Sequence, residues 1–330
     1  MLRLLVAALI AVSATRDGRA LDMNVHTDEQ EKLAYVNMWG PIESGDDQKF
    51  RSLVLPYVNA GYLIYKVNIY SGGGSVDAAM AIGDQIRTLQ ARTVAPFKLT
   101  KIINNKKVIT NTPTCSFDEA KGGHIYPRLV TGPTWCDCAS ACFLIWASGA
   151  VREGGYVGIH RSYWKGREFG QLRPNEAERK YKEAQARYTA YLKKLDVPQA
   201  LIDRLFSTDS HSMYYLTWPD HQLMQSTPYL EEMTYSRCGQ SKTEHMGPKN
   251  NWTMTEDIEH INCYRGLLKE VMRDGASKYI ASYVIGQNDT GVAPAVPAAP
   301  VEPSDGVAKT EPATESTKHR FGRTIDLGCT

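Results

Sequence analysis

The chain has 330 residues, of which 42% are hydrophobic, so it is long enough to bury one sizeable core and to carry appended segments. Its formal net charge of +2 provides no strong field for binding nucleic acid or an acidic ligand. Composition therefore favours a globular protein, whose chemistry must be sought in individual motifs.

The N-terminus combines Arg3 with an apolar run over residues 4–14 that is too short to span a bilayer. This pattern predicts a signal peptide over residues 1–20, with a cleavage site at 18–20 and a mature chain that begins near Leu21. An N-terminal membrane anchor is the alternative. We expect an exported protein, in the bacterial periplasm or outside the cell, where disulfides persist.

The next region alternates between strand and helix patterns. Strands are expected where β-branched and aromatic residues alternate, and helices where apolar residues recur every three or four positions. The expected elements are a strand at 33–42, a helix at 46–58, a strand at 62–70, a helix at 76–89 and a strand at 93–95. A glycine run at 72–74 precedes Ser75, which is expected to cap the second helix. This repetition predicts an α/β fold.

Residues 97–133 are polar, irregular and dotted with glycine, so we interpret them as an insertion, with a hairpin built on 102–103 and 108–109. Regular patterns return after it. They predict a short apolar helix at 141–147, a strand at 156–160, helices at 174–195 and 198–205, a strand at 213–216 and a short helix at 218–224.

The C-terminal part divides into two segments. Residues 227–285 are expected to form a largely helical extension, in which Cys238 and Cys263 are the expected disulfide pair because they lie together, apart from the other cysteines. Residues 286–330 are rich in Ala, Pro, Thr and Glu without periodicity, which predicts a disordered tail.

The chain has seven cysteines, an odd number, so at least one thiol has no partner within the chain. Pairing stays open for Cys115, Cys136, Cys138, Cys142 and Cys329. Cys115 has Cys136 or Cys138 as candidate partners, and Cys138 and Cys142 are equally compatible with small buried residues. The Cys-Asp-Cys spacing at 136–138 lacks a second pair, so no metal site is expected.

The most informative motif is Cys-Ala-Ser-Ala-Cys at 138–142, which runs into the apolar helix. Ser140 at the start of a buried helix, followed by His160 at the end of a short strand, is an arrangement that presents a nucleophile and its base. The glycine turn at 72–74 would supply backbone N–H groups to an oxyanion. Together these segments predict acyl-transfer chemistry.

Three segments, in this order, resemble the Clp protease proteolytic subunit within the crotonase-like fold group, and look closest to its exported bacterial relatives. Residues 68–76 are similar to the family's glycine-rich turn, 138–150 to its nucleophile turn and following helix, and 157–160 to the strand that ends in its catalytic histidine. Asp209 matches the context of the family's aspartate. Gly72 departs from the family's pattern, which has a proline there.

The resemblance covers residues 33–95 and 134–225, and implies a crotonase-like stack of β-β-α units over residues 21–226, interrupted by the insertion. Ser140 would attack a carbonyl carbon, and His160 would move its proton to the leaving amine. Asp209 would orient the imidazole, and the N–H groups of Gly74 and Ala141 would hold the oxyanion.

Each assignment has a structural alternative. Ser140 would then be a small residue at a tight turn, and His160 would bond a backbone carbonyl. Asp209 would be a turn residue, with Asp203 and His211 as competing candidates nearby.

The leading hypothesis is an exported serine peptidase that hydrolyses peptides or unfolded segments without ATP, cofactor or metal. It is expected to be a homo-oligomer with neither a nucleic-acid nor an ATPase partner. One alternative is a non-catalytic binding or assembly protein on the same fold. Another is a crotonase-type enzyme for acyl thioesters, which is disfavoured because that chemistry does not use a serine and a histidine as nucleophile and base. A serine–lysine peptidase lacks a lysine at a comparably marked position.

Overall fold

The computed structural model describes residues 21–96, 100–103, 106–109, 137–162, 171–239 and 254–288. The chain separates into two compact units, Met1–Pro294 and Ala295–Thr330, and every described element belongs to the first. The expected signal peptide and most of the expected tail lie outside the described residues. Within the described part, no helix is both long and apolar enough to cross a membrane.

The larger sheet has five strands in the order β1-β2-β3-β4-β8. The strands are β1 (Asp22–Asp28), β2 (Leu33–Trp39), β3 (Leu63–Tyr70), β4 (Arg92–Val94) and β8 (Arg152–Glu153). β1 is antiparallel to β2, and the other neighbours are parallel. The parallel strands therefore all point their carboxyl ends toward the same edge.

A second sheet has three strands in the order β10-β9-β7. They are β7 (Cys138–Ala139), β9 (Val157–Ile159) and β10 (Tyr214–Tyr215). β7 and β9 are parallel, and a parallel bridge from Ser71 to Cys138 joins the end of β3 to β7. β3 therefore pairs with β4 in its middle and with β7 just beyond its end, so the glycine turn after β3 lies beside β7.

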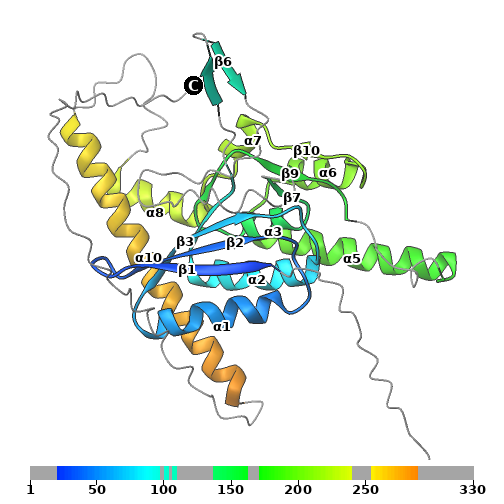
Figure 1. Ribbon diagram of the computed structural model, residues 1–330, viewed down its shortest axis with the longest axis horizontal. Coiled ribbons are helices and arrows are strands. Elements are labelled where there is room, and N and C mark those ends of the chain that lie inside the picture. The colour runs from blue at the N-terminus through cyan, green and yellow to red at the C-terminus, as the bar shows by residue number, and fades with distance from the viewer. Residues whose placement is uncertain are drawn as a thin grey trace, which may run out of the picture. The chain divides into compact units, whose positions relative to one another are not determined.

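Helices cover the sheets (Figure 1). They are α1 (Asp46–Asn59), α2 (Val76–Leu89), α3 (Cys142–Ala147), α5 (Pro174–Lys194), α6 (Gln199–Ser207), α7 (Trp218–Gln222), α8 (Pro228–Cys238) and α10 (Met254–Asn288). Phe50 of α1 and Ile82 and Ile86 of α2 are fully buried against the sheet, with Trp146 of α3 in the same core. The Ser75 hydroxyl accepts a hydrogen bond from the Ala78 amide at 3.2 Å, and so caps α2 as expected.

The structure has a mixed α/β fold with a helical C-terminal part, as the sequence predicts. Strands β1, β7 and β8 are not foreseen by the sequence patterns. β1 is an edge strand whose residues are mostly polar, so its sequence lacks the apolar alternation that indicates a strand. Its extended conformation is set by antiparallel pairing with β2 over seven residues. The strands of the expected hairpin are β5 (Thr100–Ile103) and β6 (Lys106–Ile109), which pair antiparallel. The remainder of the insertion lies outside the described residues.

The C-terminal helix α10 is part of the main core. A Cβ added to Gly275 would lie 2.6 Å from the Thr88 carbonyl oxygen of α2, so the two helix backbones are in close contact. Leu268 and Met272 are buried in a second cluster with Leu230 of α8. Residues 227–285 therefore contribute apolar surface to the same body as the sheets.

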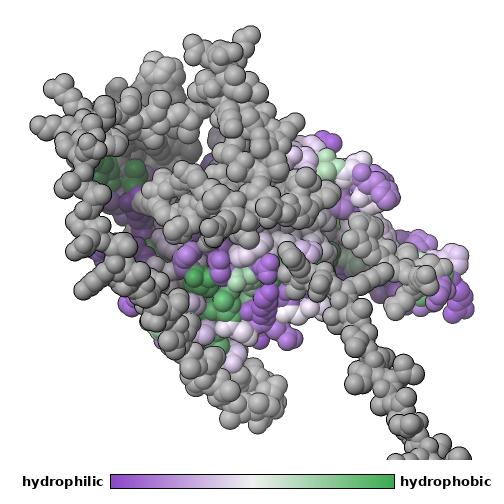
Figure 2. Space-filling view, in the orientation of Figure 1, coloured by the Kyte–Doolittle hydropathy of each residue, from purple (hydrophilic) through white to green (hydrophobic). Residues whose placement is uncertain are grey.

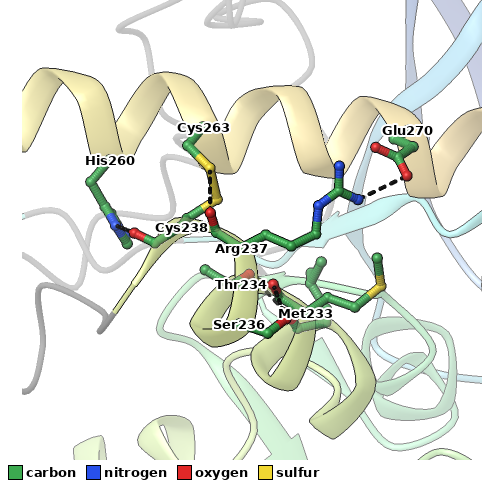
Figure 3. The surroundings of a disulfide bond; sticks show 9 residues. Met233, Thr234, Ser236, Arg237, Cys238, His260, Cys263 and Glu270 are labelled. Atoms are coloured by element: carbon green, nitrogen blue, oxygen red, sulfur yellow. Dashed lines mark hydrogen bonds and ion pairs between the residues drawn. A yellow bond between two sulfur atoms is a disulfide. The ribbon is translucent and has the colours of Figure 1, made fainter.

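A disulfide joins Cys238 at the end of α8 to Cys263 of α10, the pair expected from the sequence (Figure 3). Arg237 forms an ion pair with Glu270 at 2.9 Å, and the His260 Nδ1 atom lies 2.8 Å from the Cys238 carbonyl oxygen. These three links hold α8 against α10 over about three turns of helix.

Helix α5 is mostly hydrophilic on its surface (Figure 2). Its C-terminal half is anchored by Tyr188 and Tyr191, which are buried in the core. Two ion pairs tie it to α2: Arg187 with Asp77 at 2.6 Å and Lys194 with Asp84 at 2.8 Å. The tyrosine side of this helix therefore packs into the core.

Candidate active site

Ser140 occupies the turn between β7 and α3 and is half-buried. Its φ is 58°, a left-handed conformation that is uncommon for a residue with a side chain. The Ser140 amide donates to the Gly158 carbonyl of β9 at 3.0 Å, and its carbonyl accepts from the Phe143 amide at 3.0 Å. Backbone contacts on both sides therefore hold the serine in a strained conformation.

The glycine turn after β3 lies directly against this serine. Gly73 has a φ of 100°, and a Cβ added there would lie 2.6 Å from the Ser140 Cβ and 3.0 Å from the Ala141 nitrogen. Ser71 accepts a hydrogen bond from the Ala139 amide at 2.9 Å, which links the two segments. The structure therefore brings together two motifs that are about 70 residues apart in the sequence.

His160 immediately follows β9 and is buried. In the β7–β9 pair, Ala139 lies opposite Gly158. Ser140 and His160 therefore leave neighbouring parallel strands at the same edge of the sheet. Burial lowers the pKa of the His160 imidazole, against the smaller raising effects of the Arg161 backbone and the Asp209 charge.

Asp209 lies in an exposed turn before β10. Its carboxylate is 2.5 Å from an Arg161 guanidinium nitrogen and accepts a hydrogen bond from the His211 amide at 2.9 Å. That amide and the Arg161 charge lower the pKa of the Asp209 carboxyl. In the antiparallel β9–β10 pair Tyr214 faces Ile159, so the next position in register places Met213 opposite His160. The Asp209 charge raises the pKa of the His160 imidazole.

The candidate oxyanion donors lie on the two segments that meet at Ser140. Ile42 donates to the Gly73 carbonyl at 3.0 Å and accepts from the Ser75 amide at 2.7 Å, so the Gly74 amide takes no part in that pairing. Ala141 is the N-cap residue of α3. The amide groups at the start of a helix lack intrahelical acceptors, so this amide is free of the helix ladder.

Asp137 is a buried acid, three residues before Ser140, that the sequence analysis did not single out. It is buried, and its Oδ2 atom accepts a hydrogen bond from the Tyr215 hydroxyl at 2.8 Å. Tyr215 stacks on Tyr156 with 4.4 Å between ring centroids. Burial raises the pKa of the Asp137 carboxyl, against the lowering effect of the Tyr215 hydrogen bond. In the sequence, Asp137 stands between two cysteines and was considered only as part of their spacing. An acidic residue directly before a buried strand is unusual, and this was the signal that could have pointed to it.

A second disulfide brackets the candidate nucleophile. It joins Cys138, in β7, to Cys142, the first residue of α3, and both residues are fully buried. The sequence analysis left this pairing open. Cys115, Cys136 and Cys329 lie outside the described residues. Among the residues that are described, no group of three or more His, Cys, Asp or Glu side chains is placed to hold a metal ion.

Comparisons with known proteins identify no family for this chain: no family model matches it and no curated protein matches it. Among solved structures, a membrane-bound stomatin-specific protease is similar with a TM-score of 0.33 and 12% identity, over 63% of this chain and 84% of that one. Similarity at this level carries no argument about fold or activity.

Proposed function

We propose that this chain is an exported serine peptidase with a crotonase-like fold, in which Ser140 attacks the carbonyl carbon of a peptide bond. The observation that carries the proposal is the turn between β7 and α3, where a residue with a hydroxyl side chain adopts a φ of 58°. Backbone strain of this kind persists only where surrounding structure imposes it, and it clusters at functional sites.

His160 is the proposed general base. Its position at the end of β9, beside the strand that leads into Ser140, supports this role. The lowered pKa of its imidazole favours the neutral form at neutral pH, which is the form that accepts a proton. His160 would take the Ser140 proton during attack and deliver it to the leaving amine.

The N–H groups of Gly74 and Ala141 are the proposed oxyanion donors. The close contact of Gly73 with Ser140 supports this assignment, because it brings the glycine turn against the nucleophile. Donors aimed at the developing oxyanion are typically worth about 3–4 kcal/mol each in the transition state. Asp209 would contribute through its negative charge, which favours the imidazolium that forms when His160 is protonated.

The proposed compartment is the periplasm or the extracellular space. The apolar run after Arg3 and the two disulfides support export, since disulfides persist in oxidising compartments. The proposed substrates are peptides or unfolded segments, processed without an ATPase, and the proposed assembly is a homo-oligomer. No cofactor is proposed.

One observation favours a second candidate, a non-catalytic binding protein. The Asp209 carboxylate is exposed and bound by Arg161, and the position facing His160 in register is Met213. An exposed carboxylate that is paired with an arginine differs from the buried carboxylate that orients the imidazole in a complete triad.

Labelling with a fluorophosphonate probe tests between the two candidates. The oxidised, exported protein should react at Ser140, as located by peptide mass spectrometry, and Ser140→Ala and His160→Ala should each abolish the reaction with little change in the far-UV circular dichroism spectrum. Ser148→Ala is a matched control, because Ser148 is a buried serine at the other end of α3. Absence of Ser140 labelling in the wild-type protein would favour the binding protein.

A further inference from the structure

The Cys138–Cys142 disulfide closes the loop that contains Ser140. The Cα atoms of the two cysteines are 5.1 Å apart, whereas four extended residues would span roughly 13 Å. The bond joins Cys138 in β7, two residues before the serine, to Cys142, the first residue of α3 after it. Both arms of the turn are therefore tied directly to each other.

This cross-link adds to the restraints on a strained residue. The left-handed conformation at Ser140 is unfavourable for a residue with a side chain. Single hydrogen bonds hold it on each side, through Gly158 and through Phe143. Without the disulfide, α3 and β7 would be joined at this point only by the two-residue turn itself and by their packing.

The disulfide is also shielded from solvent. Both cysteines are 0% exposed, so a reductant in solution does not reach the sulfur atoms of the folded protein. The state of the bond is therefore decided when the chain folds, by the redox conditions of that compartment. This property distinguishes it from a reversible surface switch.

We infer that the Cys138–Cys142 disulfide is a positioning device that makes the Ser140 site competent only in chains that fold under oxidising conditions. The inference rests on the proposed function of Ser140. A chain that folds with both thiols reduced keeps its core but holds Ser140 loosely, so it reacts poorly. The peptidase would thereby stay inactive before export and become active after it.

The activating step is a thiol–disulfide exchange with an external disulfide as oxidant. The thiolate of one cysteine attacks the external disulfide and forms a mixed disulfide, which releases one external thiol. The second cysteine thiolate then displaces the remaining external thiolate, so the S–S bond forms, and the two protons lost by the cysteines are taken up by the two external thiolates. Two electrons pass from the protein thiols to the external disulfide, which is reduced to two thiols.

The test compares two double variants of the full chain, prepared under oxidising conditions. Cys138→Ala/Cys142→Ala removes the bond at the site, and Cys238→Ala/Cys263→Ala removes the remote bond between α8 and α10. The first should lower the rate of fluorophosphonate labelling about 10- to 100-fold, the range expected for a displacement of about 1 Å at a nucleophile. The second should label at the wild-type rate even though its melting temperature falls, which separates positioning from general stability.

A second measurement avoids reliance on the fold of the alanine variant. The Cys238→Ala/Cys263→Ala protein is unfolded and reduced, then refolded in parallel with a dithiol and with increasing proportions of oxidised glutathione. Each product is labelled, and peptide mapping measures its fraction of closed Cys138–Cys142 bond. Labelling should rise in step with that bond. Equal rates with the bond open and closed, within about twofold, would overturn the inference and leave the proposed function standing. Absence of Ser140 labelling in the fully oxidised wild-type protein would overturn both.

Discussion

The glycine turn offers a direct test of how tightly the site is packed. In Gly73→Ala, the new Cβ would lie 2.6 Å from the Ser140 Cβ and 3.0 Å from the Ala139 carbonyl oxygen. Carbon atoms in contact prefer about 3.5–4.0 Å, so Ser140 and the turn must separate by about 1 Å. The φ of 100° at this position adds the strain of a left-handed conformation.

The expected loss of stability is the sum of the backbone strain and the steric overlap. Left-handed strain contributes about 1–2 kcal/mol, and overpacking in a tight contact contributes about 1–3 kcal/mol. We therefore expect Gly73→Ala to destabilise the protein by about 2–5 kcal/mol in urea unfolding. A displacement of about 1 Å at Ser140 should also lower its fluorophosphonate labelling rate by up to about 100-fold.

Gly72→Ala is the matched control. A Cβ added to Gly72 would meet nothing within 4 Å, so this variant should label at the wild-type rate and unfold at or slightly above the wild-type urea midpoint. The reasoning would be refuted if Gly73→Ala and Gly72→Ala had the same labelling rate and the same unfolding midpoint.

Two further predictions follow from the charges and the cross-links. Asp209 raises the pKa of His160, so Asp209→Asn should shift the acidic limb of the pH profile of Ser140 labelling to lower pH, and a shift to higher pH would contradict the assignment. Loss of the Cys238–Cys263 bond, which spans 25 residues, should lower the free energy of unfolding by about 3 kcal/mol, as measured by urea titration of the double alanine variant. An unchanged unfolding midpoint would show that α8 and α10 stay associated without the bond.

Local signals predicted the elements that build most of the site. Apolar periodicity located α2, and the Ser75 cap marked where it begins. Alternation of apolar residues located β3, and the short apolar run located α3. These signals act within one or two turns of helix or one strand, so they can be recognised without knowing what packs against the segment.

Interactions between distant segments could not be predicted in the same way. β8 is two residues long and is defined by its pairing with β4, and the polar edge strand β1 becomes regular through its pairing with β2. The disulfide between Cys138 and Cys142 was one of several pairings open to the sequence, because cysteine spacing does not determine connectivity. Such features depend on register and on neighbours that are remote in the chain.

The candidate site shows the same division. The sequence by itself made Ser140 and His160 the candidates, because each stands at the junction of recognisable elements, and it pointed to the glycine turn beside β3. Only the tertiary structure decided that Gly73 touches Ser140, that Asp209 is bound by Arg161, and that Asp137 is buried beneath Tyr215. The physical reason is that residue type and local periodicity can be recognised within a short segment. Burial, contact and charge pairing depend on which distant segments become neighbours when the strands pair.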